Sequence, residues 1–427
     1  MDGKCILITY NYSVNSINAH VTPAVSVYVF LLLNMVTQIL TILTTLVASS
    51  YPLVDLSHEL NVYGSVPGLD PSPYYSIQVR AADGRSGWRE AFTWLTECTA
   101  EKFCNTTGAF NYLANWSNSY INFEMEAGAE VAVKITKLWG DEPITKAVVR
   151  PRQAATSCEV TEAGEAVVTI NKPGLFTVDI NGQMDDQDTG KLPNSRGFYD
   201  GPPIHTVTIF ANPILEDKPS LEDAGVHQVS PGEQPPTEGD WDTLYFLPGV
   251  HDIGHSYPVR GSRRYYIPGD ALVHGTINSF ASPGDTDNVT IYGHGTLSGD
   301  RLPHPHYSDL PEAEHWRYGP VGIQHTPGTR LLGLTVANSA YHSVMLQQGT
   351  SDRPILVSWV KMMTWRANGD GFNPQKFAVM EDCFIRTQDD SSYVNGLGIR
   401  RVVYWQDANG STFVLSPLGS EVRVPQF

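Results

Sequence analysis

Three aspartates near the end of the chain have the residue type and spacing that acid/base chemistry requires. Asp370 lies in the tetrapeptide Asn-Gly-Asp-Gly, and Asp389 and Asp390 form an adjacent pair in the run TQDDSSYV. The apolar, alternating segment Phe377–Ile385 lies between them and is typical of a single strand. Two acidic sites separated by one strand and one turn could place a proton donor beside an ionised base.

Crowded carboxylates raise one another's pKa, so a protonated acid can coexist with ionised neighbours near neutral pH. Glycosidic cleavage needs this combination. One carboxylic acid protonates the leaving oxygen and a carboxylate activates water, with about 6.5–9.5 Å between the two groups in an inverting enzyme. Each acidic run taken alone also suits a solvated turn, because Asp and Asn cap turns with their own side chains. Their recurrence within one regular array favours a site.

The elements that must position these acids follow one another as short β-rich runs bounded by Gly, Asn or Asp. Runs that begin at Thr329, Arg353, Lys376 and Ile399 are separated by 24, 23 and 23 residues. A period in the twenties with β-rich units indicates a solenoid. The leucine-rich repeat pattern is absent, which favours a right-handed parallel β-helix. The longer gap before Thr329 predicts a loop insertion, containing residues 304–320.

A β-helix would bring the acids together. Equivalent positions on successive coils stack about 4.8 Å apart. Asp389 follows Asp370 by 19 residues, somewhat less than one coil, so both are expected to face one groove. Adjacent side chains alternate along a strand, but at a turn both Asp389 and Asp390 can reach that groove.

The first half of the mature chain has a sequence pattern different from that of the repeats. Residues 51–213 contain short predicted strands punctuated by Gly, Pro, Asn and Asp without an obvious helix, which indicates a β-sandwich. Residues 214–240 are rich in Pro, Glu, Asp and Gly and are predicted to be a linker. The expected fold is therefore all-β: a β-sandwich over 51–213 and a β-helix catalytic domain over 241–427. The chain ends soon after the acids, so we expect the solenoid to be truncated at its C-terminus.

The composition of the chain disfavours some classes of binding partner. The chain has 427 residues and a net charge of −17, which argues against binding nucleic acid through phosphates. Its five cysteines include no Cys-x-x-Cys pair, which disfavours a structural zinc site. Cys98 and Cys104 could close a small disulfide loop, and Cys383, on an alternating apolar strand, is predicted to be a buried thiol.

An uncharged segment, Ala24–Ser49, is long enough to span a bilayer and ends in small residues. Residues 1–50 are therefore predicted to be a signal peptide or a signal anchor; a misplaced start codon would also explain the first residues. Each reading predicts a secreted protein or, alternatively, a membrane-anchored one with its catalytic domain outside. Membrane contact is expected only through this segment. Four glycosylation sequons, which begin at Asn105, Asn115, Asn288 and Asn409, are compatible with that location.

The order Asn-Gly-Asp-Gly, then EDCFIRTQDDS one coil later, resembles glycoside hydrolase family 49 (dextranase and isopullulanase), which is related to the family 28 polygalacturonases. The runs LYFLPGVHDIG and VTIYGHGTLSGD resemble the entry into such a β-helix. A β-sandwich placed before the β-helix is what family 49 has. The resemblance covers His205 to the C-terminus. Family 28 enzymes carry a later Gly-His-Gly and Arg-Ile-Lys, and neither follows Asp390.

The resemblance implies an inverting mechanism in which Asp389 is the general acid and Asp370 and Asp390 hold and activate water. It also implies that Asn368 orients a carboxylate or the sugar and that Gln388 lines the site. It implies no metal, no cofactor and no covalent intermediate. From residue type alone, Trp365, Tyr393 and Trp405 could stack on sugar rings, and His325 and His342 could line the groove. Arg386 is expected to pair with a carboxylate in a structural role.

The sequence thus favours an endo-acting, inverting glycoside hydrolase of a polysaccharide, with a dextran-like α-glucan as the favoured substrate. A polygalacturonase-like pectin hydrolase is the alternative within the same class. A β-helix polysaccharide lyase is disfavoured by the scarcity of Lys near the acids. A non-catalytic carbohydrate-binding β-helix protein stays open.

Overall fold

Strands make up nearly all the regular structure of the computed structural model. The residues that it describes are 60–98, 116–183, 204–279, 286–305, 315, 317–366, 368–374, 376–394, 396–407 and 410–415. Helical structure within these ranges is of the 3-10 type: it includes the turn η1 (Arg152–Ala154) and the residues Pro305, His315, Arg317 and Tyr318. No helix there is long and apolar enough to cross a membrane. The segment Ala24–Ser49, Cys104 and the sequons at Asn105, Asn115 and Asn409 lie outside the described residues.

The first two sheets form a sandwich. One has the order β1-β5-β11-β10-β7, with β4 paired to β5, and the other has the order β3-β2-β6-β9-β8. All their pairings are antiparallel except β5–β11, which is parallel. The bounds are β1 (Leu60–Val62), β2 (Tyr75–Ala81), β3 (Arg89–Ala91), β4 (Trp94–Cys98), β5 (Trp116–Met125), β6 (Val131–Lys137), β7 (Ala147–Arg150), β8 (Ser157–Val160), β9 (Ala166–Ile170), β10 (Gly174–Ile180) and β11 (Ile204–Pro213).

Alternation builds the sandwich core. In β2, Tyr75, Ile77 and Val79 are buried while the residues between them are half-exposed, and they pack with side chains of the opposite sheet such as Phe176 and Ile209. By contrast, β5 is buried at every position. One face of β5 meets the sandwich core, and its other face meets the second half of the molecule.

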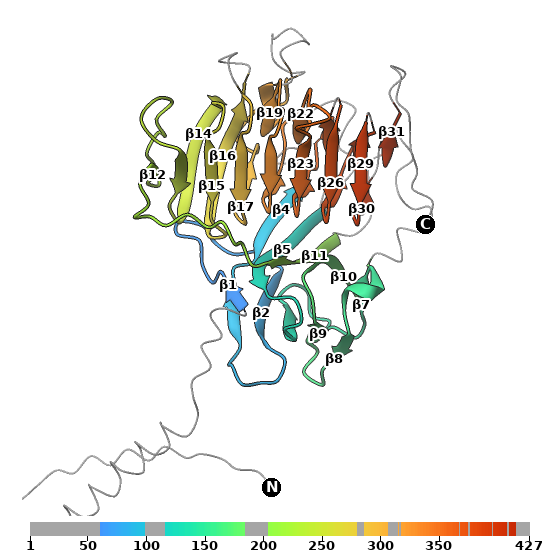
Figure 1. Ribbon diagram of the computed structural model, residues 1–427. Helices are drawn as coiled ribbons and strands as arrows, with labels where there is room; N and C mark the ends of the chain where they lie inside the picture. Colours follow the sequence, from blue (N-terminus) through green and yellow to red (C-terminus); the bar gives the residue numbers. More distant parts are fainter. Residues whose placement is uncertain are drawn as a thin grey trace, which may run out of the picture. The chain divides into compact units, whose positions relative to one another are not determined.

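That second half is a parallel β-helix with three faces. Face 1 is an eight-stranded sheet in which every pairing is parallel. Its strands lie side by side in the order of the chain (Figure 1). Their bounds are β12 (Val226–Val229), β13 (Thr243–Phe246), β15 (Arg264–Ile267), β17 (Thr290–Gly293), β20 (Arg330–Leu332), β23 (Ile355–Ser358), β26 (Ala378–Glu381) and β29 (Leu397–Arg400).

Faces 2 and 3 belong to one twelve-stranded sheet that turns a corner through the long strand β16. On one side β16 pairs with β14 along its length; on the other side its first half pairs with β18 and its end pairs with β19. Face 2 contains β14 (Gly249–Pro258), β16 (Ala271–Asn278), β18 (Thr296–Ser298), β21 (Thr335–Ala337), β24 (Lys361–Met363), β27 (Phe384–Thr387) and β30 (Val403–Gln406). Face 3 contains β19 (Val321–Ile323), β22 (Val344–Leu346), β25 (Phe372–Pro374), β28 (Ser392–Tyr393) and β31 (Phe413–Val414).

Each coil contributes one apolar side chain or more per face to a continuous interior. In one coil these are Val357 from face 1, Met362 from face 2 and Phe372 from face 3, and all three are fully buried. Cys383 lies in the same interior at 0% exposure, which confirms the predicted buried thiol. Stacked apolar positions of this kind supply the main stabilisation of a solenoid, because each coil covers its neighbour.

Face 2 packs against strands β5 and β11 of the sandwich. The Tyr120 hydroxyl lies 3.0 Å from the Thr296 hydroxyl, and the Asn118 amide donates to Met363 Sδ at 3.3 Å. Buried Lys361 on β24 donates to Asn212 Oδ1 at 2.5 Å and to the Gly333 carbonyl at 2.6 Å. These polar contacts, together with a shared apolar cluster, fix the sandwich to the side of the β-helix.

The predicted order of a β-sandwich followed by a parallel β-helix is confirmed. The gap predicted to hold an insertion does so: β18 ends at Ser298 and β19 begins at Val321. The predicted near-constant period after Thr329 is wrong in detail, because the register pairs Arg330 with Leu356, Leu356 with Val379 and Val379 with Gly398, so these coils contain 26, 23 and 19 residues. Strand β12 lies inside the predicted linker, 214–240, and pairs with β13.

Candidate active site

The predicted catalytic aspartates lie at one edge of the β-helix, where successive coils turn from face 2 to face 3. We call this edge, formed by the turns after β21, β24 and β27, the acid corner. Ser343 N donates to the Asp370 carbonyl and Gly371 N to the Asp390 carbonyl, both at 2.8 Å. Together with the strand register that follows, these bonds put His342, Asp370 and Asp390 at equivalent positions on three successive coils. Asp390, rather than Asp389, is the residue in register with Asp370.

Tyr393 joins two of the carboxylates. Its hydroxyl donates to Asp370 Oδ2 at 2.5 Å and lies 3.3 Å from Asp390 Oδ2. Its ring stacks on that of His342, with 5.9 Å between ring centroids and 29° between planes. Tyr393 is predicted to bind substrate through its ring, and in the structure its hydroxyl contacts the two acids.

Burial is the main cause of an unusual protonation state. Asp370 is 3% exposed, and desolvation, assisted by the charges of Asp389 and Asp390, raises its pKa well above the usual value, while the Tyr393 hydrogen bond opposes the rise. Burial also lowers the pKa of His342 to about 3, which makes this imidazole neutral. The His342 Nδ1 atom lies 3.3 Å from Asp370 Oδ2. This contact is therefore not an ion pair.

The turn that carries the acid pair is held by its own backbone and by the next coil. Asp390 N donates to Asp389 Oδ1 at 3.0 Å, and Ser411 N donates to Asp390 Oδ1 at 2.7 Å. Gln406 Nε2 donates to the Asp389 carbonyl at 2.8 Å. Both aspartates are half-buried, so they remain open to a ligand while Asp370 does not.

Gly410 allows the next coil to approach this turn. It has a φ of +75°, which favours glycine, and a Cβ there would lie 2.4 Å from Asp390 N and 2.7 Å from Asp389 Oδ1. Any side chain at this position would push against the acids. The sequence analysis missed this residue, although a glycine followed by Ser one coil after an acid pair is a readable signal.

The buried guanidinium of Arg386 lies beneath the acid corner. Arg386 donates from Nε to Asp407 Oδ2 at 3.0 Å, and both side chains are 1% exposed. The Arg386 guanidinium lies 3.7 Å from the ring centroid of Trp405 and 4.4 Å from that of Trp365. The predicted pairing of Arg386 with a carboxylate is thus present, and it ties three coils together just before the acid pair.

Two predicted substrate contacts have placements that do not suit them. Trp365 is 2% exposed, and its ring is covered by Arg386, so it offers no face to a sugar. His325 is exposed and lies two residues after β19, at the far end of its strand from the acid corner. In both cases the residue type suits a contact with sugar, but the strand register places the side chain where it does not make that contact.

Gln388 and Asn368 lie in the turns of the acid corner. Gln388 is 1% exposed, and neither its amide nitrogen nor its amide oxygen has a hydrogen-bond partner among the described residues. A buried amide without partners costs free energy unless water or a ligand satisfies it, which fits its predicted place in the site. Asn368 is half-buried in a left-handed conformation, with a φ of 52°, two residues before Asp370.

Arg366 is a further residue that the sequence analysis missed. It donates to the Leu302 carbonyl at 2.6 Å and to the Asp300 carbonyl at 3.0 Å, so it holds the start of the inserted loop against the coil that carries Asp370. Burial lowers the pKa of Arg366 to about 10. Asp300 in turn lies 2.5 Å from His274 Nδ1 through Oδ1. Across the described ranges, no group of three or more His, Cys, Asp or Glu side chains is arranged to hold a metal ion.

Comparison with known proteins gives a likeness in fold. No protein-family model matches the chain, and no curated protein matches it. Among solved structures, Dex49A from Penicillium minioluteum has a TM-score of 0.60 and 19% sequence identity, with 81% of this chain and 68% of that chain covered. A structure titled "a putative glycosyl hydrolase from Parabacteroides merdae ATCC 43184" has a TM-score of 0.25 and 15% identity over 40% of this chain and 82% of that one, which is too low to carry an argument. The chain is therefore similar in fold to Dex49A.

Proposed function

We propose that the protein is a glycoside hydrolase that cleaves a polysaccharide by general acid/base catalysis at the acid corner. The observation that carries this proposal is the Tyr393 hydroxyl between Asp370 and Asp390, in a cluster of three carboxyls of which one has a strongly raised pKa. Such a cluster holds a proton near neutral pH and still contains ionised carboxylates, which is what glycosidic cleavage needs. The fold likeness to Dex49A supports the resemblance to family 49.

The distances within the acid corner help to assign a catalytic role to each aspartate. Two oxygens that share one hydroxyl partner cannot be further apart than the sum of their distances to it, 2.5 and 3.3 Å for Asp370 and Asp390. That sum is below the roughly 6.5–9.5 Å that an inverting pair leaves for its water. We therefore assign Asp370 and Asp390 to one side of the reaction, as the pair that holds and activates water. Asp389, on the half-exposed turn, is assigned as the acid that protonates the leaving oxygen.

The charges of Asp389 and Asp390 add to the effect of burial on Asp370 and raise its pKa. Burial places a proton on the cluster, and the reaction needs that proton on Asp389 when substrate is bound. Expulsion of water by the sugar would favour the protonated form of Asp389, and the charge then left on Asp370 would be stabilised by the Tyr393 hydroxyl, which donates to Asp370 Oδ2 at 2.5 Å, while Asp390 accepts a hydrogen bond from Ser411 N. The products would have inverted anomeric configuration.

The substrate that fits this site best is neutral. The guanidiniums of Arg366 and Arg386, which precede the acids on their coils, are engaged with backbone carbonyls, Asp407 and the Thr206 hydroxyl. Neither is available to bind the carboxylate of a uronic acid, and a net charge of −17 repels polyanions. A neutral α-glucan such as dextran is the substrate that we favour over polygalacturonate.

The test is release of reducing ends from dextran, pullulan and polygalacturonate, with the anomer of the first product read by NMR. We expect release from dextran with inversion. Release from polygalacturonate alone would refute the neutral substrate, and retention of configuration would refute the assignment of roles. An unsaturated product that absorbs in the ultraviolet would indicate a lyase instead.

A further inference from the structure

A second candidate binding site lies on face 1, outside the acid corner. A cavity of about 740 Å³ opens between strands β15, β17 and β20 and the segment 213–217, which leads from the sandwich into the β-helix. The volume is within the roughly 300–1,000 Å³ of small-ligand sites. The cavity shares no lining residue with the acid corner, so it needs an explanation of its own.

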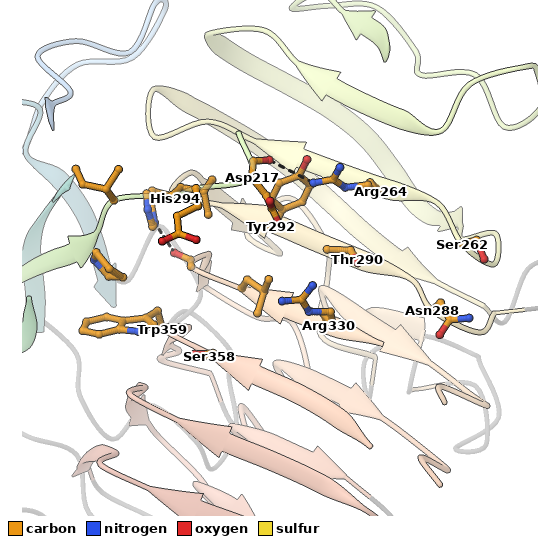
Figure 2. A pocket seen from close by; sticks show the side chains of 16 residues that line it. Asp217, Ser262, Arg264, Asn288, Thr290, Tyr292, His294, Arg330, Ser358 and Trp359 are labelled. Carbon is orange, nitrogen blue, oxygen red and sulfur yellow. Dashed lines mark hydrogen bonds between the residues drawn. The ribbon is translucent and has the colours of Figure 1, made fainter. Parts of the chain in front are cut away.

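A ladder of three polar side chains forms one wall. The register pairs Arg264 with Thr290 and Thr290 with Arg330, so two guanidiniums flank one hydroxyl on three successive coils, each about 4.8 Å from the next at the backbone. Their neighbours in sequence, Tyr265 and Leu331, point into the core at 0% and 1% exposure. Figure 2 shows Arg264, Thr290 and Arg330 on three neighbouring strands along the cavity.

The two arginines are in different states. Arg264 donates to the Asp217 carbonyl at 3.2 Å and lies 4.7 Å from the ring centroid of Tyr292, so its guanidinium is held in place (Figure 2). Arg330 is exposed, and its guanidinium makes no hydrogen bond or ion pair with another described residue. It is therefore a cationic donor that faces the cavity ready for a ligand, in a chain that is otherwise strongly acidic.

The opposite wall supplies acceptors and a flat ring. Glu216 and Asp217 are exposed on the segment that crosses face 1, and at the cavity edge Ser358 ends β23 and Trp359 follows it. Two carboxylates balance the two guanidiniums, which disfavours a polyanion. Interleaved donors and acceptors beside an indole suit a polyhydroxylated chain, because each sugar hydroxyl both donates and accepts while the sugar's C–H surface packs on a ring.

We propose that this cavity binds a segment of a neutral glycan, the same class of polymer that the acid corner is proposed to cleave; this inference rests on the proposed function. Binding at face 1 would keep the enzyme on its polymer between cleavage events. A second contact on the same chain raises the effective concentration of glycan at the acid corner.

The test must use protein that carries no glycan on Asn288. This residue lines the cavity, is exposed, and begins the sequon Asn288-Val289-Thr290. A glycan attached there would fill the cavity. The protein is therefore produced in a host without N-glycosylation, with Asp389→Asn in the background so that the probe is not degraded.

The experiment measures retardation of this protein in native gels that contain soluble dextran. The variants are Arg264→Ala with Arg330→Ala, and Thr290→Val, which keeps the β-branched shape and removes the hydroxyl. Arg353→Ala is the matched control, since Arg353 lies on the same side of the β-helix, pairs with Asp287 at 2.8 Å and does not line the cavity. We expect the double variant to weaken dextran binding at least tenfold, Thr290→Val a few-fold, and the control less than twofold.

The outcomes separate this inference from the proposed function. Equal retardation of the double variant and the control would overturn the inference and leave the proposed function intact. Retardation by carboxymethyl-dextran but not by dextran would also overturn it, in favour of an anionic ligand. If the protein without the background substitution fails to cleave dextran, yet dextran binding depends on Arg264 and Arg330, the binding site stands and the proposed function falls.

Discussion

The Tyr393 hydroxyl lies between Asp370 and Asp390, 2.5 Å from one carboxylate and 3.3 Å from the other. The two aspartates are in register on successive coils, and Tyr393 comes from the strand that follows the second of them. One phenol thus sets the separation of two acids that the chain brings together from different turns.

Tyr393→Phe tests this relationship. The Tyr393 hydrogen bond lowers the pKa of Asp370 against the effect of burial, so its loss should raise that pKa further. If Asp370 acts ionised, the acid limb of the kcat/KM profile moves to higher pH, and kcat/KM at the optimum falls about 10- to 100-fold. A profile measured on dextran from pH 3 to 8 checks this. A fall in rate with no movement of the acid limb would show that Tyr393 does not act through Asp370.

Gly410→Ala tests whether the coil after the acid pair positions it. A Cβ at Gly410 would meet Asp390 N at 2.4 Å, whereas a Cβ at Gly84, with a nearly equal φ of +73°, would meet nothing within 4 Å. Both substitutions cost about 1–2 kcal/mol of backbone strain, but only Gly410→Ala should displace the acids and lower kcat about 100-fold. Equal activity of the two variants, at matched stability in urea, would contradict this role of the last coil.

Asp407→Asn tests the charge pair beneath the corner. It leaves the Arg386 guanidinium, 1% exposed, without its ionised partner, and we expect a loss of about 3–5 kcal/mol in the free energy of unfolding. The double variant Arg386→Met with Asp407→Leu should recover most of that loss, because no charge then remains buried. Urea denaturation measures both. If the double variant is less stable than Asp407→Asn, the pair contributes more than the avoidance of an unpaired charge.

The burial of Lys361 predicts that the free energy of unfolding depends on pH. Burial lowers its pKa from 10.5 to about 7, against the opposing charges of Cys383 and Glu124. Between pH 7 and about 10 the unfolded chain binds the Lys361 proton and the folded chain does not, so this residue makes stability rise with pH in that window. The wild type should therefore gain stability relative to Lys361→Met from pH 7 to pH 9.5 in urea titrations. A difference between the two proteins that is constant with pH would mean that Lys361 stays charged in the folded state.

The sequence predicted the fold well because its signals are local. Apolar runs bounded by turn residues predict strands without knowledge of their neighbours. The single strand predicted over Phe377–Ile385 is wrong, however, because β26 ends at Glu381, Asp382 has a φ of 53° and β27 begins at Phe384. Cys383 lies in the turn between β26 and β27 and is buried in the interior of the β-helix.

What could not be predicted depends on register between coils. Coil lengths vary, so the sequence did not indicate that Asp390, and not Asp389, pairs with Asp370. Arg386 pairs with Asp407 on the next coil and covers the ring of Trp365. Trp365, a candidate for stacking on a sugar, is therefore a buried structural residue. The residue type of Trp365 gave no indication of this, because the partner comes from another turn.

The central claim is that the carboxyl groups of the acid corner perform the chemistry, and Asp389→Asn tests it most directly. This variant keeps the size of the side chain and removes the proton donor, so kcat on dextran should fall at least about 1,000-fold, while stability in urea stays within 1 kcal/mol of the wild type. Asp352→Asn, the same change at an exposed turn residue on another coil, should retain full activity. If Asp389→Asn is folded and as active as Asp352→Asn, the acid corner is not the catalytic site.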